Sequence, residues 1–394
     1  MRSVQIVLFL LLFYALPCWS AEHETLPPPL QQGLTDFNQG LLLEAYDAFA
    51  AYHKENPGDP RALFYEAMSK WKMMWLTSYN PQDRGDLIAL LHDAEDAYED
   101  IADRDSDSLF YYASVIGLRA QLAATDGDWW GTAQLGKKMK KSAEKLLKQD
   151  PEYYDADYLL GSFNYFADTL PGHVKFFRAL LFLPGGDRKA GLEQLNTAYQ
   201  KGKLTNGEAG RTLSIIYTYF EHSYEDGRKL CDTILTNNPD AFDVGLYKGI
   251  DLYFSNDWED AITWMQQLHE RLVNYSEKHR NSHQQPIVPV YLPIDRELHY
   301  WIARCMIQQK KYEAARELLV KLADPELHQP WWLMRGVFLS LAQIDYIQEH
   351  PEDAEKRIKR VMDWPDAKDS HDKAKLLQKK KADLDDPYAI DFKD

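Results

Sequence analysis

Small and apolar residues recur along the chain at fixed distances, and this recurrence is the strongest pattern in the sequence. A small residue is followed by a second one twelve positions later in four places: Gly33 and Ala45, Gly249 and Ala261, Ala303 and Ala315, Ala342 and Ala354. An apolar residue stands four positions after each second small residue: Phe49, Met265, Leu319 and Ile358. Spacings of three or four place residues on one face of a helix, and small residues let two helices approach closely. The pattern therefore predicts a series of antiparallel helix pairs.

The longer period of the same pattern indicates a repeat. Gly227 and Ala261 occupy equivalent positions in two successive helix pairs, and Pro57 and Pro239 stand where a second helix should end. These residues resemble the tetratricopeptide repeat (TPR), a helix–turn–helix of about 34 residues with small residues near positions 8 and 20. The resemblance covers most of residues 30–365. It implies an all-α fold, an α-solenoid of TPR-like repeats over residues 30–368, in which each helix pair is buried against its neighbours.

The C-terminal residues 369–394 are expected to form a capping helix and a polar tail. A solenoid needs a polar outer face at its ends. The segment contains a group of lysines that suits such a solvated face: Lys373, Lys375, Lys379, Lys380 and Lys381. A docking patch is the alternative interpretation of these lysines, and we favour the cap.

The repeat pattern is interrupted twice. Gly161 and Gly191 match the two small positions of one repeat, but their separation is more than double the usual twelve positions, which places an insertion near residues 168–187. Ala261 and Ala315 match the second small positions of successive repeats, yet they too lie much farther apart than one repeat length. This places a second insertion near residues 276–294. We expect it to be a lengthened helix followed by an extended, proline-rich segment over 280–295.

The first insertion is too apolar for a free loop, so its side chains must be buried on the solenoid, on a partner or at a membrane surface. We favour burial on the solenoid. The residues that would dock a partner are His173, Lys175, Phe176, Phe177 and Arg178. The closing Gly185, Gly186 and Asp187 resemble a phosphate-binding turn only superficially, because Asp187 is acidic. Asp187 is better interpreted as the N-cap of the following helix.

The N-terminal residues have the layout of a secretory signal peptide. Arg2 precedes an apolar run, and the small residues Cys18 and Ser20 precede Ala21, which predicts a signal peptide over 1–20, cleaved after Ser20, and a linker over 21–29. The apolar run is short for a membrane span of about 20 residues. Pro17 disfavours acylation of Cys18. We therefore expect an exported chain in the periplasm or secreted, without a transmembrane span after cleavage.

The net charge bears on the class of partner, and the cysteine count bears on disulfide bonds. The formal net charge of −16 in 394 residues disfavours nucleic acid as a partner. Only Cys231 and Cys305 follow the signal peptide, which excludes a disulfide scaffold. One bridge between them is conceivable in an oxidising compartment. Because the repeat places them two repeats apart, we favour two buried thiols.

No motif for catalysis, a cofactor or a metal ion stands out. The chain lacks the zinc-protease, nucleophile-elbow and phosphate-loop signatures, so we expect neither an enzyme nor a cofactor. His279 and His283 are four apart, but no third ligand has a suitable spacing, so no metal site is predicted. Residues 126–130 resemble an acidic metal loop superficially. Trp129 and Trp130 are instead expected to open a helix and pack.

The TPR resemblance implies a binding groove lined by position 12 of each repeat. The corresponding residues are mostly aromatic: Phe37, Tyr165, Tyr219, Tyr253, Ile307 and Tyr346. Such a series can hold a peptide by stacking and phenol hydrogen bonds. Filling of the seams between helices is an equal alternative. The sequence thus predicts an exported scaffold that binds a protein or peptide, with a structural subunit of an envelope assembly as the alternative.

Overall fold

The computed structural model describes six stretches of the chain: residues 25–76, 81–169, 185–283, 292–323, 331–364 and 370–380. Within these residues the chain forms 17 α-helices and no strand. The helices are α1 (Pro28–Gln39), α2 (Leu42–Glu55), α3 (Pro60–Leu76), α4 (Pro81–Glu99), α5 (Ser106–Thr125), α6 (Trp129–Gln149), α7 (Asp155–Thr169), α9 (Arg188–Lys201), α10 (Asn206–Tyr219), α11 (Tyr224–Asn237), α12 (Phe242–Phe254), α13 (Trp258–His283), α14 (Leu292–Gln308), α15 (Tyr312–Leu322), α16 (Trp331–Ile347), α17 (Pro351–Met362) and α18 (Ser370–Lys380). No described helix is both long enough and apolar enough to cross a membrane.

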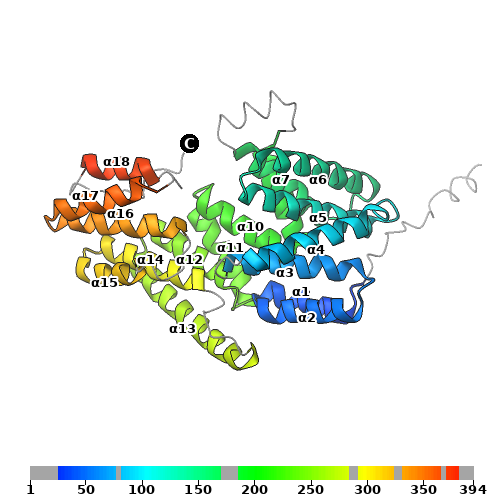
Figure 1. Cartoon of the computed structure of the whole chain (residues 1–394), viewed down its shortest axis with the longest axis horizontal. Coiled ribbons are helices and arrows are strands. Elements are labelled where there is room, and N and C mark those ends of the chain that lie inside the picture. Colours follow the sequence, from blue (N-terminus) through cyan, green and yellow to red (C-terminus); the bar gives the residue numbers. More distant parts are fainter. Residues whose placement is uncertain are drawn as a thin grey trace, which may run out of the picture.

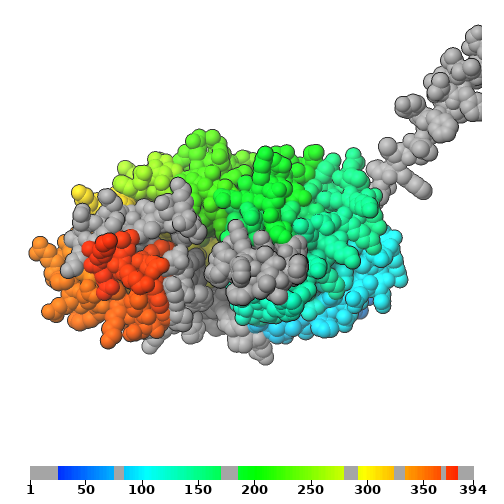
Figure 2. Space-filling model, turned by 90° about the horizontal axis from the view of Figure 1, so that it is seen from above, coloured from blue at the N-terminus to red at the C-terminus, as the bar shows by residue number. Residues whose placement is uncertain are grey.

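Successive helices pack as pairs, and each pair also contacts the next, from α1 and α2 to α16 and α17 (Figure 1). The C-terminal helices lie at one end of the elongated molecule, and α4, α5 and α6 lie at the other (Figure 2). The predicted all-α solenoid of TPR-like repeats is confirmed by this arrangement.

The predicted close approach of paired helices is present at the small residues. A Cβ added at Gly33 of α1 would lie 2.4 Å from Cε1 of Phe49 on α2. A Cβ added at Gly249 of α12 would lie 2.7 Å from Cε of Met265 on α13. The apolar residues four positions after each second small residue are buried: Phe49, Met265, Leu319 and Ile358. The small residues therefore set the distance between the helices of a pair.

The first interruption follows the predicted register. A Cβ at Gly161 of α7 would lie 2.9 Å from the carbonyl oxygen of Gly191 on α9, so these helices cross at the two expected glycines. Asp187 caps α9, because its carboxylate accepts the backbone N–H of Ala190 at 3.0 Å. The candidate docking residues of this insertion lie outside the described residues: His173, Lys175, Phe176, Phe177 and Arg178.

The second interruption differs from the prediction at both edges. Helix α13 continues through residues 280–283, and α14 already begins at Leu292, so the extended segment cannot reach 280–295. Pro293 is the second residue of α14, where a helix tolerates proline because the first N–H groups have no intrahelical partner. The proline count alone therefore overestimated the extended segment. The side chains of His279 and His283 lie outside the described ones.

The two ends of the described helices and the two cysteines can be compared with the sequence. Helix α1 begins at Pro28, slightly before the predicted start of the solenoid. Helix α18 packs on α16 and α17 through the buried Ala374 and Leu377. Lys375 and Lys379 are exposed, but Lys373 is only 8% exposed beside Ala374, so the expectation that Lys373 lies on the solvated face is wrong. Cys231 and Cys305 are buried free thiols. Burial raises the pKa of the Cys305 thiol to about 12, so it stays protonated at neutral pH.

A buried carboxyl in α12 makes the stability of the fold depend on pH. Asp251 is fully buried against α11, where a Cβ on Gly227 would lie 2.6 Å from Oδ2 of Asp251. Burial raises the pKa of Asp251 to about 8, and the Thr218 hydroxyl and the Arg228 charge counteract only part of this effect. Between pH 3.8 and 8 the folded chain holds a proton that the unfolded chain has lost. The free energy of unfolding therefore falls as pH rises, by about 1.4 kcal/mol per pH unit from this group.

We expect Asp251→Asn to stabilise the protein at neutral pH. The amide resembles the protonated carboxyl and removes the cost of keeping it protonated. The gain should be about 2 kcal/mol at pH 7, since a buried amide has its own cost. Urea denaturation of both proteins from pH 5 to pH 8 measures the effect. A variant with the same stability and the same pH slope as the wild type would contradict the assignment of this slope to Asp251.

Candidate functional site

The aromatic series predicted to line a groove lies mostly inside the solenoid. Five of its six members are at most 5% exposed, and Tyr219 is half-buried against the ring of Tyr247. The five are Phe37, Tyr165, Tyr253, Ile307 and Tyr346. A partner can reach only small parts of these side chains.

The phenol groups of the series already have partners within the chain. Tyr165 donates a hydrogen bond to Glu221 at 2.6 Å, and Tyr253 accepts one from Arg304 at 3.1 Å. Burial and the neighbouring Glu221 carboxylate raise the pKa of Tyr165, so its hydroxyl remains a donor. These contacts are those expected of residues that fill the seams between helices. Recognition of a peptide by this series remains a prediction.

The solenoid curves so far that its first helix pair contacts helices from the second half of the chain. Gly40, at the C-terminus of α1, has φ of 85°, and a Cβ there would lie 2.3 Å from the carbonyl oxygen of Asp240. Both the positive φ and the close approach require glycine. On α2, Glu44 accepts a hydrogen bond from Tyr275 of α13 at 2.5 Å. The N-terminal pair therefore lies across α10, α12 and α13.

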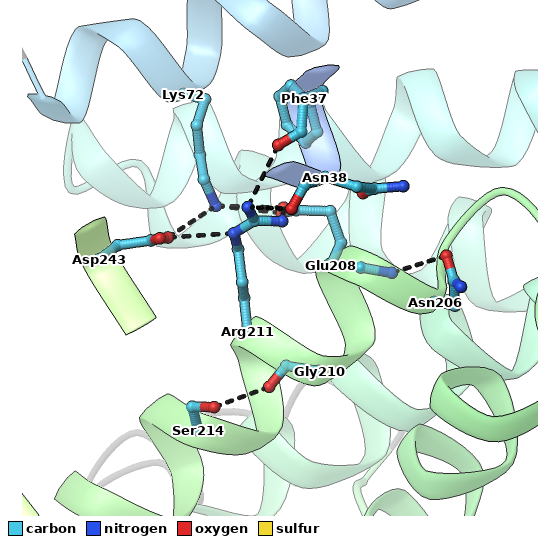
Figure 3. Close-up of polar contacts among 10 residues, drawn as sticks. Phe37, Asn38, Lys72, Asn206, Glu208, Gly210, Arg211, Ser214 and Asp243 are labelled. Atoms are coloured by element: carbon cyan, nitrogen blue, oxygen red, sulfur yellow. Dashed lines mark hydrogen bonds and ion pairs between the residues drawn. The ribbon is translucent and has the colours of Figure 1, made fainter. Parts of the chain in front are cut away.

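An ion-pair cluster holds this contact (Figure 3). Its members come from three separate helices: Lys72 on α3, Glu208 and Arg211 on α10, and Asp243 on α12. Arg211 is 2% exposed and donates to the backbone carbonyls of Phe37 at 3.1 Å and Asn38 at 3.0 Å. These carbonyls belong to the last turn of α1, at the negative end of the helix dipole, and the Phe37 carbonyl also accepts the N–H of Gly40 at 3.2 Å. Arg211 thus caps α1, the first described helix, from a helix that is distant in sequence.

The charges of the ion-pair cluster are balanced. Asp243 lies 3.2 Å from Nε of Arg211 and 3.8 Å from Nζ of Lys72, and Glu208 lies 3.2 Å from Lys72. Burial alone would raise the pKa of Asp243, but the charges of Arg211 and Lys72 hold it below its ordinary value. The ion-pair cluster thus contains two basic and two acidic side chains.

The cavity beside the ion-pair cluster is small. Its empty volume is about 200 Å³ including open solvent, below the range of about 300–1,000 Å³ typical of ligand pockets. It is lined by Gly40, Leu42, Lys72, Arg211, Phe242, Asp243 and Ile294. This geometry suits a cluster that fixes the curvature of the solenoid better than a site that binds a small molecule.

An exposed aromatic pair lies at the start of α6. Trp129 is 58% exposed and Trp130 is 55% exposed, so the expectation that they open a helix is right and the expectation that they pack is wrong. Asp128 caps this helix by accepting the N–H of Gly131 at 2.9 Å. The first residues of a helix project beyond its neighbours when the preceding turn is short, which explains the exposure. The two indoles are thus held by an ordered, capped helix start.

The turn before this pair is tied to α4. Asp126, just before α6, forms an ion pair with Arg84 of α4. Ile88, four positions after Arg84 on the same helix face, is 46% exposed. The Arg84–Asp126 ion pair therefore holds the turn before α6 against α4. We call Trp129 and Trp130 the tryptophan patch; they are two of the six exposed large hydrophobic residues in the described part of the chain.

Comparisons with known proteins give structural likeness only. No family model matches the chain, and no curated protein matches it. Human IFIT1, in a dimer with m7Gppp-AAAA, is 12% identical with a TM-score of 0.46 over 89% of this chain and 72% of that one. A TPR protein from Parabacteroides merdae is 13% identical with a TM-score of 0.32 over 89% and 96%. The TPR domain of P58(IPK) is 14% identical with a TM-score of 0.24 over 89% and 98%.

Proposed function

We propose that this chain is an exported, TPR-like scaffold that binds a protein or peptide through the tryptophan patch. The observation that carries the proposal is the exposure of two adjacent indoles on a capped helix start. Tryptophan is enriched in protein interfaces and among their energetically dominant residues. Because Asp128 and the Arg84–Asp126 ion pair already fix the backbone, little conformational entropy is lost on binding.

Other functions have less support in the described residues. The charged groups of the ion-pair cluster are mutually paired, and the cavity beside them is smaller than typical ligand pockets. This favours a binding protein over an enzyme. The net charge of −16 opposes binding to a phosphate backbone, so the m7Gppp-AAAA ligand of human IFIT1 is not carried over.

Export is the second part of the proposal. The apolar run behind Arg2 and the small residues Cys18 and Ser20 support cleavage before Ala21. The mature scaffold would then act in the periplasm, at the cell envelope or outside the cell. Two buried thiols without a disulfide are compatible with such a compartment because burial keeps them protonated and unreactive.

We expect the double variant Trp129→Ala/Trp130→Ala to lose partner binding while it keeps its stability. Loss of two interface indoles should weaken binding at least about tenfold. Pull-down from an envelope extract, followed by an affinity measurement with the captured protein, tests this. Val320→Ala is the matched control, because Val320 of α15 is 51% exposed but lies outside the patch. Equal binding by the wild type and the double variant would contradict the proposed site.

A further inference from the structure

Two imidazoles and a carboxylate converge where α13 packs on α14. His269 comes from α13, and Asp295 and His299 come from α14. Asp295 and His299 are four positions apart, so they share one helix face, and that face meets His269. One potential ligand atom from each residue lies within 4.8 Å of the other two. All three side chains are partly buried, with 34%, 19% and 29% exposed for His269, Asp295 and His299.

The contacts within this triad orient its ligand atoms. Nδ1 of His269 lies 2.7 Å from Oδ1 of Asp295, and Nδ1 of His299 lies 3.7 Å from the same oxygen. Nδ1 of His299 also lies 2.8 Å from the backbone carbonyl of Asp295. A carbonyl can only accept, so this Nδ1 carries the proton. In the neutral ring Nε2 then has a free lone pair, as in histidines whose second nitrogen is fixed by an outer hydrogen bond.

We propose that His269, Asp295 and His299 bind a divalent transition metal ion of the zinc class. Two imidazoles and one carboxylate are a common three-ligand set for zinc, and a water molecule completes such sites. With metal–ligand distances of about 2.0–2.2 Å, tetrahedral ligand atoms lie about 3.3 Å apart. The present spacings extend to 4.8 Å, so binding requires the three side chains to rotate. The exposed fractions leave room for the water.

Metal binding at this site would join two helices. The ion then links α13 to α14, the two helices that flank the second insertion. We therefore expect α13 and α14 to be held together more firmly when the metal ion is bound. Without a metal, the same residues form no more than a hydrogen-bonded His–Asp pair with a second ring stacked edge-on at 4.8 Å.

The test uses the purified chain after chelator treatment and dialysis. Isothermal titration with ZnCl₂ should show one site, and zinc should raise the thermal midpoint. His269→Ala and His299→Ala should each weaken zinc binding at least about tenfold and remove the thermal shift. His92→Ala is the matched control: His92 and Asp96 on α4 also stand four apart, at 3.3 Å, with both side chains exposed. That control should bind zinc as the wild type does.

Two further measurements keep the proposal falsifiable. His299→Gln tests a smaller change if the alanine variant is unstable without metal, and it should show the same loss of zinc binding. The double variant His279→Ala/His283→Ala should retain the site. Absence of a zinc-induced thermal shift in the wild type would overturn the proposal. So would unchanged zinc binding in His269→Ala and His299→Ala, or loss of binding only in the His279→Ala/His283→Ala variant.

Discussion

Replacing Arg211 by alanine is expected to open the contact between the first helix pair and α10. The guanidinium is buried, neutralises Asp243 and donates to two backbone carbonyls at the end of α1. Its loss leaves a largely buried carboxylate with less compensation and takes one donor away from each of the two carbonyls. Breaking a buried ion pair from one side costs about 3–5 kcal/mol. The free energy of unfolding should fall by about this amount.

Hydrogen exchange locates the expected effect of Arg211→Ala. Amides of α1 and α2 should exchange faster, because these helices lose their anchor, while amides of α16 and α17 should stay unchanged. Arg228→Ala is the control: Arg228 forms an exposed ion pair with Asp257 at 3.0 Å, and such pairs contribute about 0–1 kcal/mol. If Arg211→Ala costs no more than Arg228→Ala, the ion-pair cluster does not hold the N-terminal pair.

Replacing Asp155 by alanine is expected to be as damaging. This carboxylate is 2% exposed and accepts the backbone N–H groups of Lys203, Leu204 and Thr205 at 3.1, 2.8 and 2.7 Å. The Thr205 hydroxyl donates a fourth hydrogen bond at 2.8 Å. Asp155 thus fixes the turn between α9 and α10. Its removal leaves several buried donors without an acceptor, which should cost about 3–5 kcal/mol of stability.

Asp187 is the control for Asp155, because its carboxylate accepts only one backbone N–H. Asp187 accepts one N–H at the exposed start of α9, so Asp187→Ala should cost only about 1 kcal/mol. Chemical denaturation of both variants measures the difference. Equal costs for the two substitutions would show that the turn before α10 does not depend on the Asp155 carboxylate.

Local patterns were sufficient to predict the helix pairs and their crossings. The glycines of α7 and α9 meet as predicted, because a close helix crossing leaves no room for a larger side chain. Asp187 caps α9 for an equally local reason, the need of the first N–H groups for an acceptor. Features that depend on the residue pattern within each helix can therefore be predicted from the sequence.

Contacts across the curve of the solenoid could not be predicted in this way. Arg211 looks like any polar residue of an amphipathic helix, and its partner Phe37 on α1 lies 174 positions earlier. The aromatic residues at position 12 have the same spacing whether they line a groove or fill seams, so their burial depends on curvature. His269 and His299 stand on opposite sides of the second insertion, and their wide separation in sequence matches no compact metal motif.

The sequence contains only a weak indication that Trp129 and Trp130 are exposed. Two bulky residues directly after a capping aspartate lie in the first turn of a helix, where the side chains point towards the preceding loop. Whether that loop covers them depends on its length, and the turn at residues 126–128 is short. Tryptophan usually favours burial, so the sequence predicted that Trp129 and Trp130 pack, whereas the short turn leaves both side chains exposed.

The most direct test of the scaffold proposal is site-specific photo-crosslinking in the native cell. A photoreactive amino acid in place of Trp130 should yield a discrete crosslinked product with a partner protein, because the tryptophan patch lies in the interface. The same amino acid in place of Val320, which is similarly exposed on α15, should yield none. Absence of a product at position 130, or identical products from both positions, would contradict the proposal that this patch binds the partner.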